Sequence, residues 1–367
     1  MSNDNCQIAI FFPCGHLELV PSIKNIAIAL ADFGYKVDLY TAENVHSPKP
    51  HVDHPNVILN ILPWRQRKAY EPVFVLTPLF TLWAFCLSVR NPYLCYIGAG
   101  IRGLYTAAFV SMLTRVPFIY YSLELYPSWE SRFLTQRMSK FLERWANRRA
   151  SFTIIQDEKR ACLLAQDNSI SLEDIVIIPN VPLGKAERRS SDYLRTKFGI
   201  SENKKIILYA GTIFAPWAMT LELVQAAQHW PEEWVLVLHT SSIPDDMGYI
   251  DQLRRADQSK RVVFSVEPVP YEEVEDLMSS ADIGLALYKP TSANMRYVGL
   301  SSGKLMHYLK CGLPVIVSDL PGLSDIIEHY KCGLCVQGAD EVVNAIRTIF
   351  LHYEEYVQRA LLAFNTS

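Results

Sequence analysis

A glycine and a lysine, Gly303 and Lys304, stand where a helix is expected to begin. Residues 303–309 have helical spacing, and an apolar strand over 314–317 follows them. The first backbone N–H groups of a helix lack carbonyl partners and form the positive end of its dipole. Such an end binds phosphate, and a lysine beside it adds a full positive charge. The spacing therefore predicts a phosphate site here; the alternative is a solvated lysine on an ordinary helix.

Alternating strands and helices must position this lysine. Each half of the chain shows short apolar strands separated by helical segments, which predicts parallel sheets with right-handed crossovers and two Rossmann-like units. The expected strands are 7–12, 36–40, 56–62, 94–97, 117–121 and 152–155 in the first half, and 205–209, 234–238, 262–264, 283–287 and 314–317 in the second.

Length and local composition predict two domains. A chain of 367 residues is too long for one ordinary core. Prolines at 179 and 182 and the polar stretch 184–192 suit a linker. We expect an N-terminal domain over 1–182, a C-terminal domain over 183–350, and a terminal helix over 351–367 that packs back on the N-terminal domain.

Composition narrows the function classes. The net charge of −3 does not favour a nucleic-acid partner. Eight cysteines without a spacing framework suggest reduced thiols and a cytoplasmic protein. Cys332 and Cys335 form a lone CxxC without a second pair, so we expect no metal site. No basic region precedes the apolar residues 6–12, so we expect no signal peptide.

Three segments, taken in order and spacing, carry a resemblance to a known family. They are Ile178-Pro-Asn180, the stretch 267–288 with Val269-Pro270, Leu277, Ala281-Asp-Ile-Gly284 and Tyr288, and the helix and strand from Ser302 to Ile316. Together they resemble the retaining glycosyltransferases of family 4, and the resemblance covers nearly the whole chain. It implies an α/β GT-B fold, in which two Rossmann-like domains face each other across a cleft, with the donor on the C-terminal domain and the acceptor on the N-terminal one.

The resemblance also implies a donor site and a reaction. The co-substrate is a UDP- or GDP-linked sugar, with no cofactor and no metal, and Lys304 neutralises the leaving diphosphate. The nucleobase is expected near 266–268. The implied donor-binding residues are Gly211, Thr212, Val266, Glu267, Arg296, Ser302, Gly303, Lys304 and His307.

Two departures from the family pattern leave the donor nucleotide open. Gly299 and His307 stand where the family has two glutamates, the second of which holds the ribose hydroxyls. A histidine can still accept or donate one hydrogen bond there; the alternative is a packed helix histidine. Thr212 and approximately Trp217 replace an arginine and a lysine. Positive charge must then come from Lys304, Arg296 or Lys289.

The acceptor residues are expected at the carboxyl ends of strands in the N-terminal half, where ligands of open α/β sheets bind. They are Gly15, His16, Glu124 and Tyr126. With Lys304, His16 and Glu124 are the expected catalytic residues, in positioning roles, because retaining enzymes of this type are thought to use the donor's phosphate oxygen as base. The alternative for both is local capping and hydrogen bonding.

A basic segment and an apolar segment raise the question of membrane contact. The helix expected near 132–149 carries Arg132, Arg137, Lys140, Arg144, Arg148 and Arg149 among aromatic residues, which suits an anionic membrane surface. The alternative, slightly preferred, is a solvated helix with Phe141 and Trp145 both facing the core. The apolar run 73–89 is either a buried helix or a surface that touches a bilayer. We expect a cytoplasmic protein, with peripheral contact at the inner membrane face as a further expectation.

These observations predict a glycosyltransferase that moves a sugar to a hydroxyl of a glycan, a lipid-linked glycan or a small metabolite. Two alternatives stay open. One is a nucleotide-sugar epimerase of the same fold, and the other is a non-catalytic relative that binds nucleotide sugars, which the two departures favour somewhat.

Overall fold

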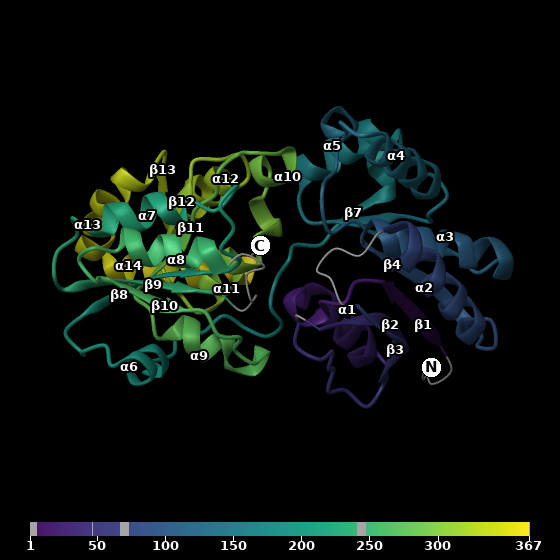
Figure 1. The fold of residues 1–367 in the computed structure, drawn as a ribbon, viewed down its shortest axis with the longest axis horizontal. Helices are drawn as coiled ribbons and strands as arrows, with labels where there is room; N and C mark the ends of the chain where they lie inside the picture. The colour runs from purple at the N-terminus through teal and green to yellow at the C-terminus, as the bar shows by residue number, and fades with distance from the viewer. Residues whose placement is uncertain (1–5, 46, 67–72, 241–246, 367) are drawn as a thin grey trace. The chain divides into compact units, whose positions relative to one another are not determined.

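The computed structural model describes residues 6–45, 47–66, 73–240 and 247–366. The chain divides into two compact units, Met1–Pro179 and Asn180–Ser367, and the division falls in the proline-containing stretch expected to be a linker. Each unit is a parallel sheet covered by helices on both faces (Figure 1). Two Rossmann-like units are thus confirmed.

The first unit contains a seven-stranded sheet in the order β3-β2-β1-β4-β5-β6-β7, and its neighbouring strands pair in parallel. The strand order reverses between β1 and β4, which makes the carboxyl ends of these strands the expected ligand edge. The strands are β1 (Gln7–Phe12), β2 (Lys36–Asn44), β3 (Val57–Gln66), β4 (Tyr93–Ala99), β5 (Phe118–Tyr121), β6 (Thr153–Ile155) and β7 (Ile175–Ile177).

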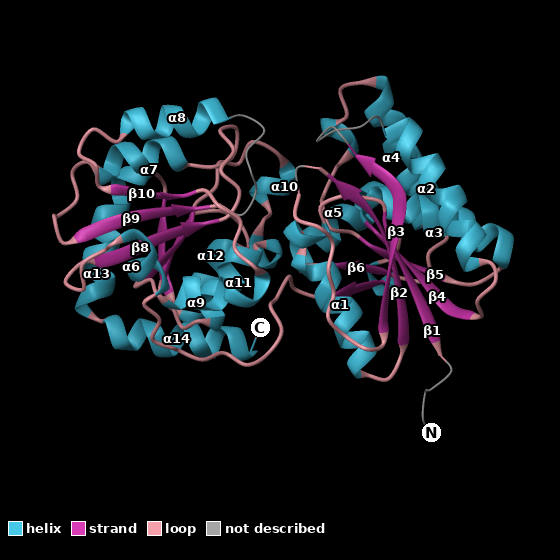
Figure 2. Cartoon of the chain, turned by 60° about the horizontal axis from the view of Figure 1, so that its bottom comes forward, coloured by secondary structure: helices cyan, strands magenta, loops and turns pink. Residues whose placement is uncertain are grey.

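Successive side chains of β1 point to opposite faces of the sheet and pack against different helical layers. Ile8 and Ile10 pack in a core with α1 (Pro21–Asp32), whereas Ala9 and Phe11 pack with helices on the opposite face. Those helices are α2 (Val73–Ser88), α3 (Gly100–Thr114) and α4 (Leu134–Asn147), which Figure 2 shows beside the strands; α5 (Glu158–Asn168) precedes β7. Neither α5 nor β7 was predicted from the sequence.

The second unit contains a six-stranded parallel sheet in the order β10-β9-β8-β11-β12-β13, which reverses between β8 and β11. Its strands are β8 (Lys205–Ala210), β9 (Trp234–His239), β10 (Val262–Ser265), β11 (Ile283–Ala286), β12 (Val315–Ser318) and β13 (Gly333–Val336). One helical layer contains α7 (Thr220–Ala227), α8 (Met247–Ala256) and α13 (Val342–Leu351). The other contains α6 (Tyr193–Phe198), α9 (Val274–Ser279), α11 (Gly303–Lys310), α12 (Leu323–Tyr330) and α14 (Tyr353–Thr366); α10 (Ala293–Arg296) is short.

The last helix, α14, belongs to the second unit. Ala360 and Ala363 are buried in the core that contains α11 and α12, and the helix packs against both. Its packing on the first unit, expected from the sequence, stays a prediction. Among the described residues, no helix is both long enough and apolar enough to cross a membrane.

Candidate functional site

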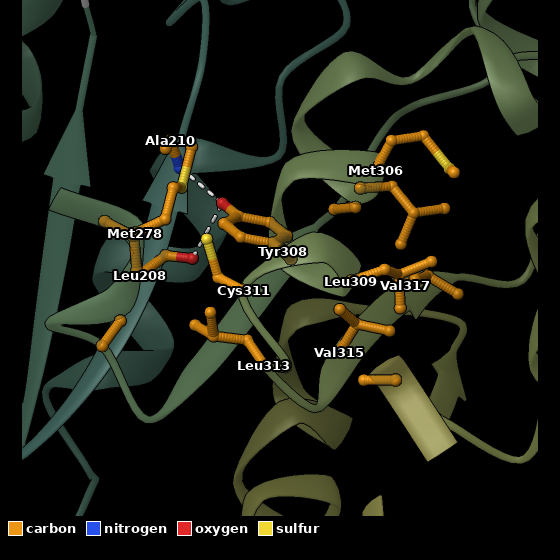
Figure 3. Close-up of a cluster of buried hydrophobic side chains, with 14 of the residues drawn as sticks. Leu208, Ala210, Met278, Met306, Tyr308, Leu309, Cys311, Leu313, Val315 and Val317 are labelled. Carbon is orange, nitrogen blue, oxygen red and sulfur yellow. Dashed lines mark hydrogen bonds between the residues drawn. The ribbon is translucent and has the colours of Figure 1, made fainter. Parts of the chain in front are cut away.

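Hydrogen bonds hold α11 in place near both of its ends. Ser302 is the N-cap, and its Oγ accepts from the Leu305 N–H at 3.4 Å and lies 2.7 Å from the Tyr288 hydroxyl. Further along the helix, the Tyr308 hydroxyl accepts from the Ala210 N–H at 2.7 Å and donates to the Leu208 carbonyl at 3.1 Å (Figure 3). These bonds hold the helix against β8, so that its first turn lies at the carboxyl edge of the sheet.

Lys304 occupies this first turn, and its amino group is enclosed. Nζ is buried, 3.7 Å from the centroid of the Tyr209 ring and 4.7 Å from that of Tyr288. In the part of the chain that the structure describes, Nζ has no hydrogen-bond partner. The ring faces attract a cation, yet an ammonium without hydrogen bonds is costly to bury. The arrangement is therefore suited to an anion that enters and pairs with Lys304.

Burial lowers the pKa of the Lys304 ammonium from 10.5 to about 7. Between about pH 7 and pH 10.5 the Lys304 side chain holds a proton in the unfolded chain and has released it in the folded chain. The free energy of unfolding should therefore rise with pH across this range, and the gain is lost as the pH falls toward 7. An anion bound beside Nζ would reverse the shift, because it favours the charged form.

We expect this titration to be visible in the free energy of unfolding. Relative to Lys304→Met, the unmodified protein should gain on the order of 2–3 kcal/mol between about pH 7 and pH 9.5, since one pKa unit corresponds to about 1.4 kcal/mol. Urea denaturation of both proteins at the two pH values measures the difference. Other titrating groups are common to both proteins and cancel, so equal changes would show that the lysine titrates normally.

Gly211 allows Lys304 to reach its place. It follows β8 with a φ of 147°, which side-chain-bearing residues rarely adopt, and a Cβ there would lie 2.9 Å from Lys304 Cε. Thr212, the other predicted residue of this turn, is exposed, and its carbonyl accepts from the Tyr209 hydroxyl at 3.2 Å. The structure thus brings Gly211 and Lys304 together, and the binding of a donor by both residues stays a prediction.

His307 lies one turn further along α11. Its Nδ1 is 2.8 Å from the Gly303 carbonyl, so Nδ1–H donates and Nε2 is left as an acceptor. Burial lowers the pKa of His307, opposed by the bond to Gly303, and the neutral ring therefore dominates at pH 7. An uncharged acceptor is compatible with the predicted bond to a ribose hydroxyl, and this role stays a prediction.

Asn180 connects the predicted linker motif to this site. Its Nδ2 donates to the Ser301 carbonyl at 3.2 Å, and its N–H donates to the Leu300 carbonyl at 3.0 Å. A Cβ on Gly303 would lie 3.2 Å from the same Nδ2. Asn180 and Gly303, 123 positions apart in the sequence, therefore fix the loop before α11 together.

The remaining predicted donor residues are Arg296, Val266 and Glu267. Arg296 is exposed at the end of α10, and Glu267 is exposed with an ion pair to Lys197 at 3.5 Å. Val266, the residue after β10, packs against the core. Lys289, the alternative source of charge, pairs with Glu222 at 2.6 Å. Contacts of Arg296, Val266 and Glu267 with a nucleotide stay predictions.

Three residues at the carboxyl edge of this sheet were not predicted as site residues. Tyr209 and Tyr288 enclose Lys304, and His239 ends β9, where its Nδ1 lies 3.0 Å from Ser265 Oγ and its carbonyl accepts from the Gly211 N–H at 2.9 Å. Burial, assisted by the charge of Lys197, lowers the pKa of His239 to about 4. Their position at strand ends was the available signal.

In the first unit, Gly15 and His16 follow β1. A Cβ on Gly15 would lie 2.7 Å from Asn44 Cβ, so this glycine is needed for close packing on the end of β2. His16 is exposed, with its ring edge-on to Phe12 at 5.8 Å. Partial desolvation and the charge of Arg102 lower the pKa of His16. These observations give Gly15 a packing role and leave the acceptor role of both residues a prediction.

Glu124 and Tyr126 follow β5 and are exposed. The sheet order places β4 between β1 and β5, so His16 and Glu124 lie at one edge on strands that are not neighbours. Arg160, which the sequence analysis missed, is buried beneath this loop and donates to the Leu123 carbonyl at 3.2 Å. Burial lowers the pKa of Arg160, and the charges of Glu124 and Asp157 oppose the shift. It stabilises the loop that carries Glu124.

The predicted packing of α4 is wrong for Phe141, which is 68% exposed, whereas Trp145 is partly buried against the core. The buried face of α4 is polar. Lys140 Nζ lies 3.0 Å from Glu143 and 2.7 Å from Asp167, and Arg144 lies 2.7 Å from the same aspartate. Part of the predicted basic surface is therefore neutralised inside the unit.

No group of three or more His, Cys, Asp or Glu side chains among the described residues could hold a metal ion. Metal independence of any reaction at this site stays a prediction.

Residues 204–352 match the family model described as Glycosyl transferases group 1, a range that contains Gly211, Lys304 and His307. Among curated protein sequences, none is significantly similar to the chain.

Solved structures resemble the whole chain. Sucrose-phosphate synthase from Thermosynechococcus elongatus has a TM-score of 0.75 at 16% identity, covering 98% of this chain and 94% of that one. Anabaena HepE in complex with UDP-glucose has a TM-score of 0.71 at 17% identity, with the same coverage, 98% and 94%. UDP-GlcNAc 2-epimerase from Neisseria meningitidis bound to UDP-GlcNAc has a TM-score of 0.60 at 12% identity, covering 96% and 93%. The fold is that of the GT-B glycosyltransferases, as predicted.

Proposed function

We propose that this chain is a glycosyltransferase that moves a sugar from a nucleotide diphosphate sugar to a hydroxyl of an acceptor. The observation that carries the proposal is the buried Lys304 ammonium, which has no hydrogen-bond partner among the described residues and lies at the start of α11. A diphosphate there would pair with Nζ and accept hydrogen bonds from the first N–H groups of the helix. The glycosyl transferase family match includes this helix.

The proposed reaction is a retaining transfer. The bond between the sugar C1 and the diphosphate oxygen breaks, a bond from C1 to the acceptor oxygen forms on the same face, and the acceptor proton passes to an oxygen of the leaving diphosphate. Lys304 stabilises the charge that develops on the leaving group. We propose that Lys304 and the helix start supply this charge without a metal, and that His16 and Glu124 position the acceptor. Retention and metal independence rest on the resemblance to family 4.

Two alternatives have observations in their favour. Likeness to a UDP-GlcNAc 2-epimerase at a TM-score of 0.60 supports an epimerase. Gly299, Thr212 and His307, in place of charged residues of the family pattern, support a relative that binds nucleotide sugars without transfer. We favour transfer because the buried Lys304 ammonium supplies the positive charge that stabilises a diphosphate leaving group. The acceptor class and a cytoplasmic location stay predictions.

We expect UDP to raise the melting temperature of the protein, because a ligand that binds only the native state stabilises it by about 2.7 kcal/mol at 100 times its Kd. A thermal-shift series with UDP, GDP and ADP, followed by incubation with the matching nucleotide sugars, makes the test. Slow release of UDP and free sugar without acceptor supports a transferase. Epimerised donor indicates the first alternative, binding without turnover indicates the second, and no stabilisation by any nucleotide contradicts the proposed site.

A further inference from the structure

Helix α4 has its polar and apolar faces inverted relative to an ordinary surface helix. The buried face carries Lys140, Glu143 and Asn147, and the exposed face carries Leu134, Met138 and Phe141. The buried groups are satisfied: Asn147 Nδ2 donates to Thr153 Oγ1 at 2.6 Å, and Lys140 is paired as described above. The polar network fixes which face is inward, and so it holds the apolar face outward.

The two neighbouring helices expose apolar side chains in the same layer. Helix α3 packs against both α2 and α4, on one face of the sheet (Figure 2). We define the apolar platform by six side chains that are each half exposed or more: Leu82 of α2, Met112 and Leu113 of α3, and Leu134, Met138 and Phe141 of α4. Exposed apolar side chains gathered on adjacent helices of one layer mark an interaction site. All sixteen residues of α2 lack charge, unlike an ordinary solvated helix.

The net charge of the segment that contains α2, α3 and α4 indicates the kind of partner. Residues 73–151 contain nine Lys and Arg against three Glu, a net charge of +6 in a chain whose net charge is −3. One of the three acids, Glu143, is buried against Lys140. Arg115, which follows α3, and Arg137, on α4 beside Met138, are exposed. Exposed apolar residues among exposed arginines suit an anionic lipid surface, where the arginines meet headgroups and the apolar side chains enter the interface.

We propose that the apolar platform docks on an anionic lipid bilayer. A second copy of the chain suits the surface less well, because a symmetric interface would bring two regions of charge +6 together. The proposal is independent of the sugar-transfer reaction, since it rests on α2, α3 and α4 of the first unit alone. The sequence-based expectation attributed membrane contact to the basic residues of α4, several of which are paired internally. The proposal attributes it to exposed apolar side chains of three helices.

Flotation of the full chain with vesicles tests the proposal. We expect binding to vesicles of equimolar phosphatidylcholine and phosphatidylglycerol, with much weaker binding to phosphatidylcholine alone. The double variant Met138→Ser/Phe141→Ser should lower the partition coefficient by about tenfold or more. The matched control is Phe33→Ser/Leu172→Ser, which removes two exposed apolar side chains of the same unit outside the platform and should bind like the unmodified chain.

Circular dichroism and the melting temperature show whether each variant remains folded; all four positions are exposed, so we expect little change. A third variant, Arg115→Gln/Arg137→Gln, should weaken binding to the anionic vesicles and leave the residual binding to neutral ones unchanged. Absence of binding to anionic vesicles at low salt overturns the proposal, as does an equal loss in the control. A concentration-dependent dimer that the Met138/Phe141 variant abolishes would assign the surface to a second copy instead.

Discussion

Replacing Lys304 by methionine should lower kcat/KM for sugar transfer by on the order of 100- to 1,000-fold, the usual cost of removing one group that stabilises transition-state charge. Methionine is one atom shorter than lysine, keeps an unbranched apolar side chain beside Tyr209 and Tyr288, and removes the charge. UDP affinity should fall as well, because the ammonium pairs with the diphosphate in the bound donor. Steady-state kinetics and calorimetric titration with UDP measure the two effects.

The same substitution should leave the nucleotide-free protein folded and, at pH 7, at least as stable as the unmodified one. The reason is that an ammonium buried without hydrogen bonds opposes folding. Lys289→Met is the matched control, because Lys289 was the alternative source of charge and is already paired with Glu222 at 2.6 Å. If Lys289→Met were the more harmful substitution for UDP binding, the diphosphate would have to be placed near α7 instead of α11.

Gly211→Ala is the second change for which we expect a large effect. The φ of 147° at this position is strained for alanine, and the new Cβ would lie 2.9 Å from Lys304 Cε. Strain of this kind costs on the order of 1–3 kcal/mol of folding stability. Lys304 must also move away from β8, so UDP affinity should fall about tenfold or more, since a misplaced charge loses most of its pairing energy.

Gly199→Ala is the control that introduces backbone strain without displacing the Lys304 side chain. Gly199 also has a positive φ, of 64°, in the same unit, but a Cβ there would meet nothing within 4 Å. This control should lose some stability and retain UDP affinity. Urea denaturation and calorimetric titration of both variants provide the comparison, and Gly211→Ala with unchanged UDP affinity would show that the position of Lys304 beside β8 is unimportant for binding.

Local patterns in the sequence were sufficient to predict most of the architecture. Strand periodicity predicted eleven of the thirteen strands in the described part of the chain, and the parallel sheets followed from their alternation with helices. The helix start at Gly303 was predicted from the same kind of information, because a helix end is specified by a few adjacent residues. The strands β7 (Ile175–Ile177) and β13 (Gly333–Val336), each at an edge of its sheet, were not predicted.

The face that α4 buries could not be predicted from its periodicity. Phe141 and Trp145 are four residues apart, which favoured a shared inward face, yet the polar side of the helix is buried. Asp167 decides this, because its carboxylate lies 2.7 Å from both Lys140 and Arg144 and belongs to a different helix. Apolar pattern alone predicts the inner face only where no buried ionic network competes with it.

By itself, the sequence determined the two parallel-sheet units, the glycine after β8 and the lysine in the first turn of α11, since each depends on neighbouring residues. Only the tertiary structure decided that this lysine is enclosed by Tyr209 and Tyr288, which are 95 and 16 positions away in the chain. Burial and pKa depend on what the fold brings around a group in space, and no local pattern of residues contains that information.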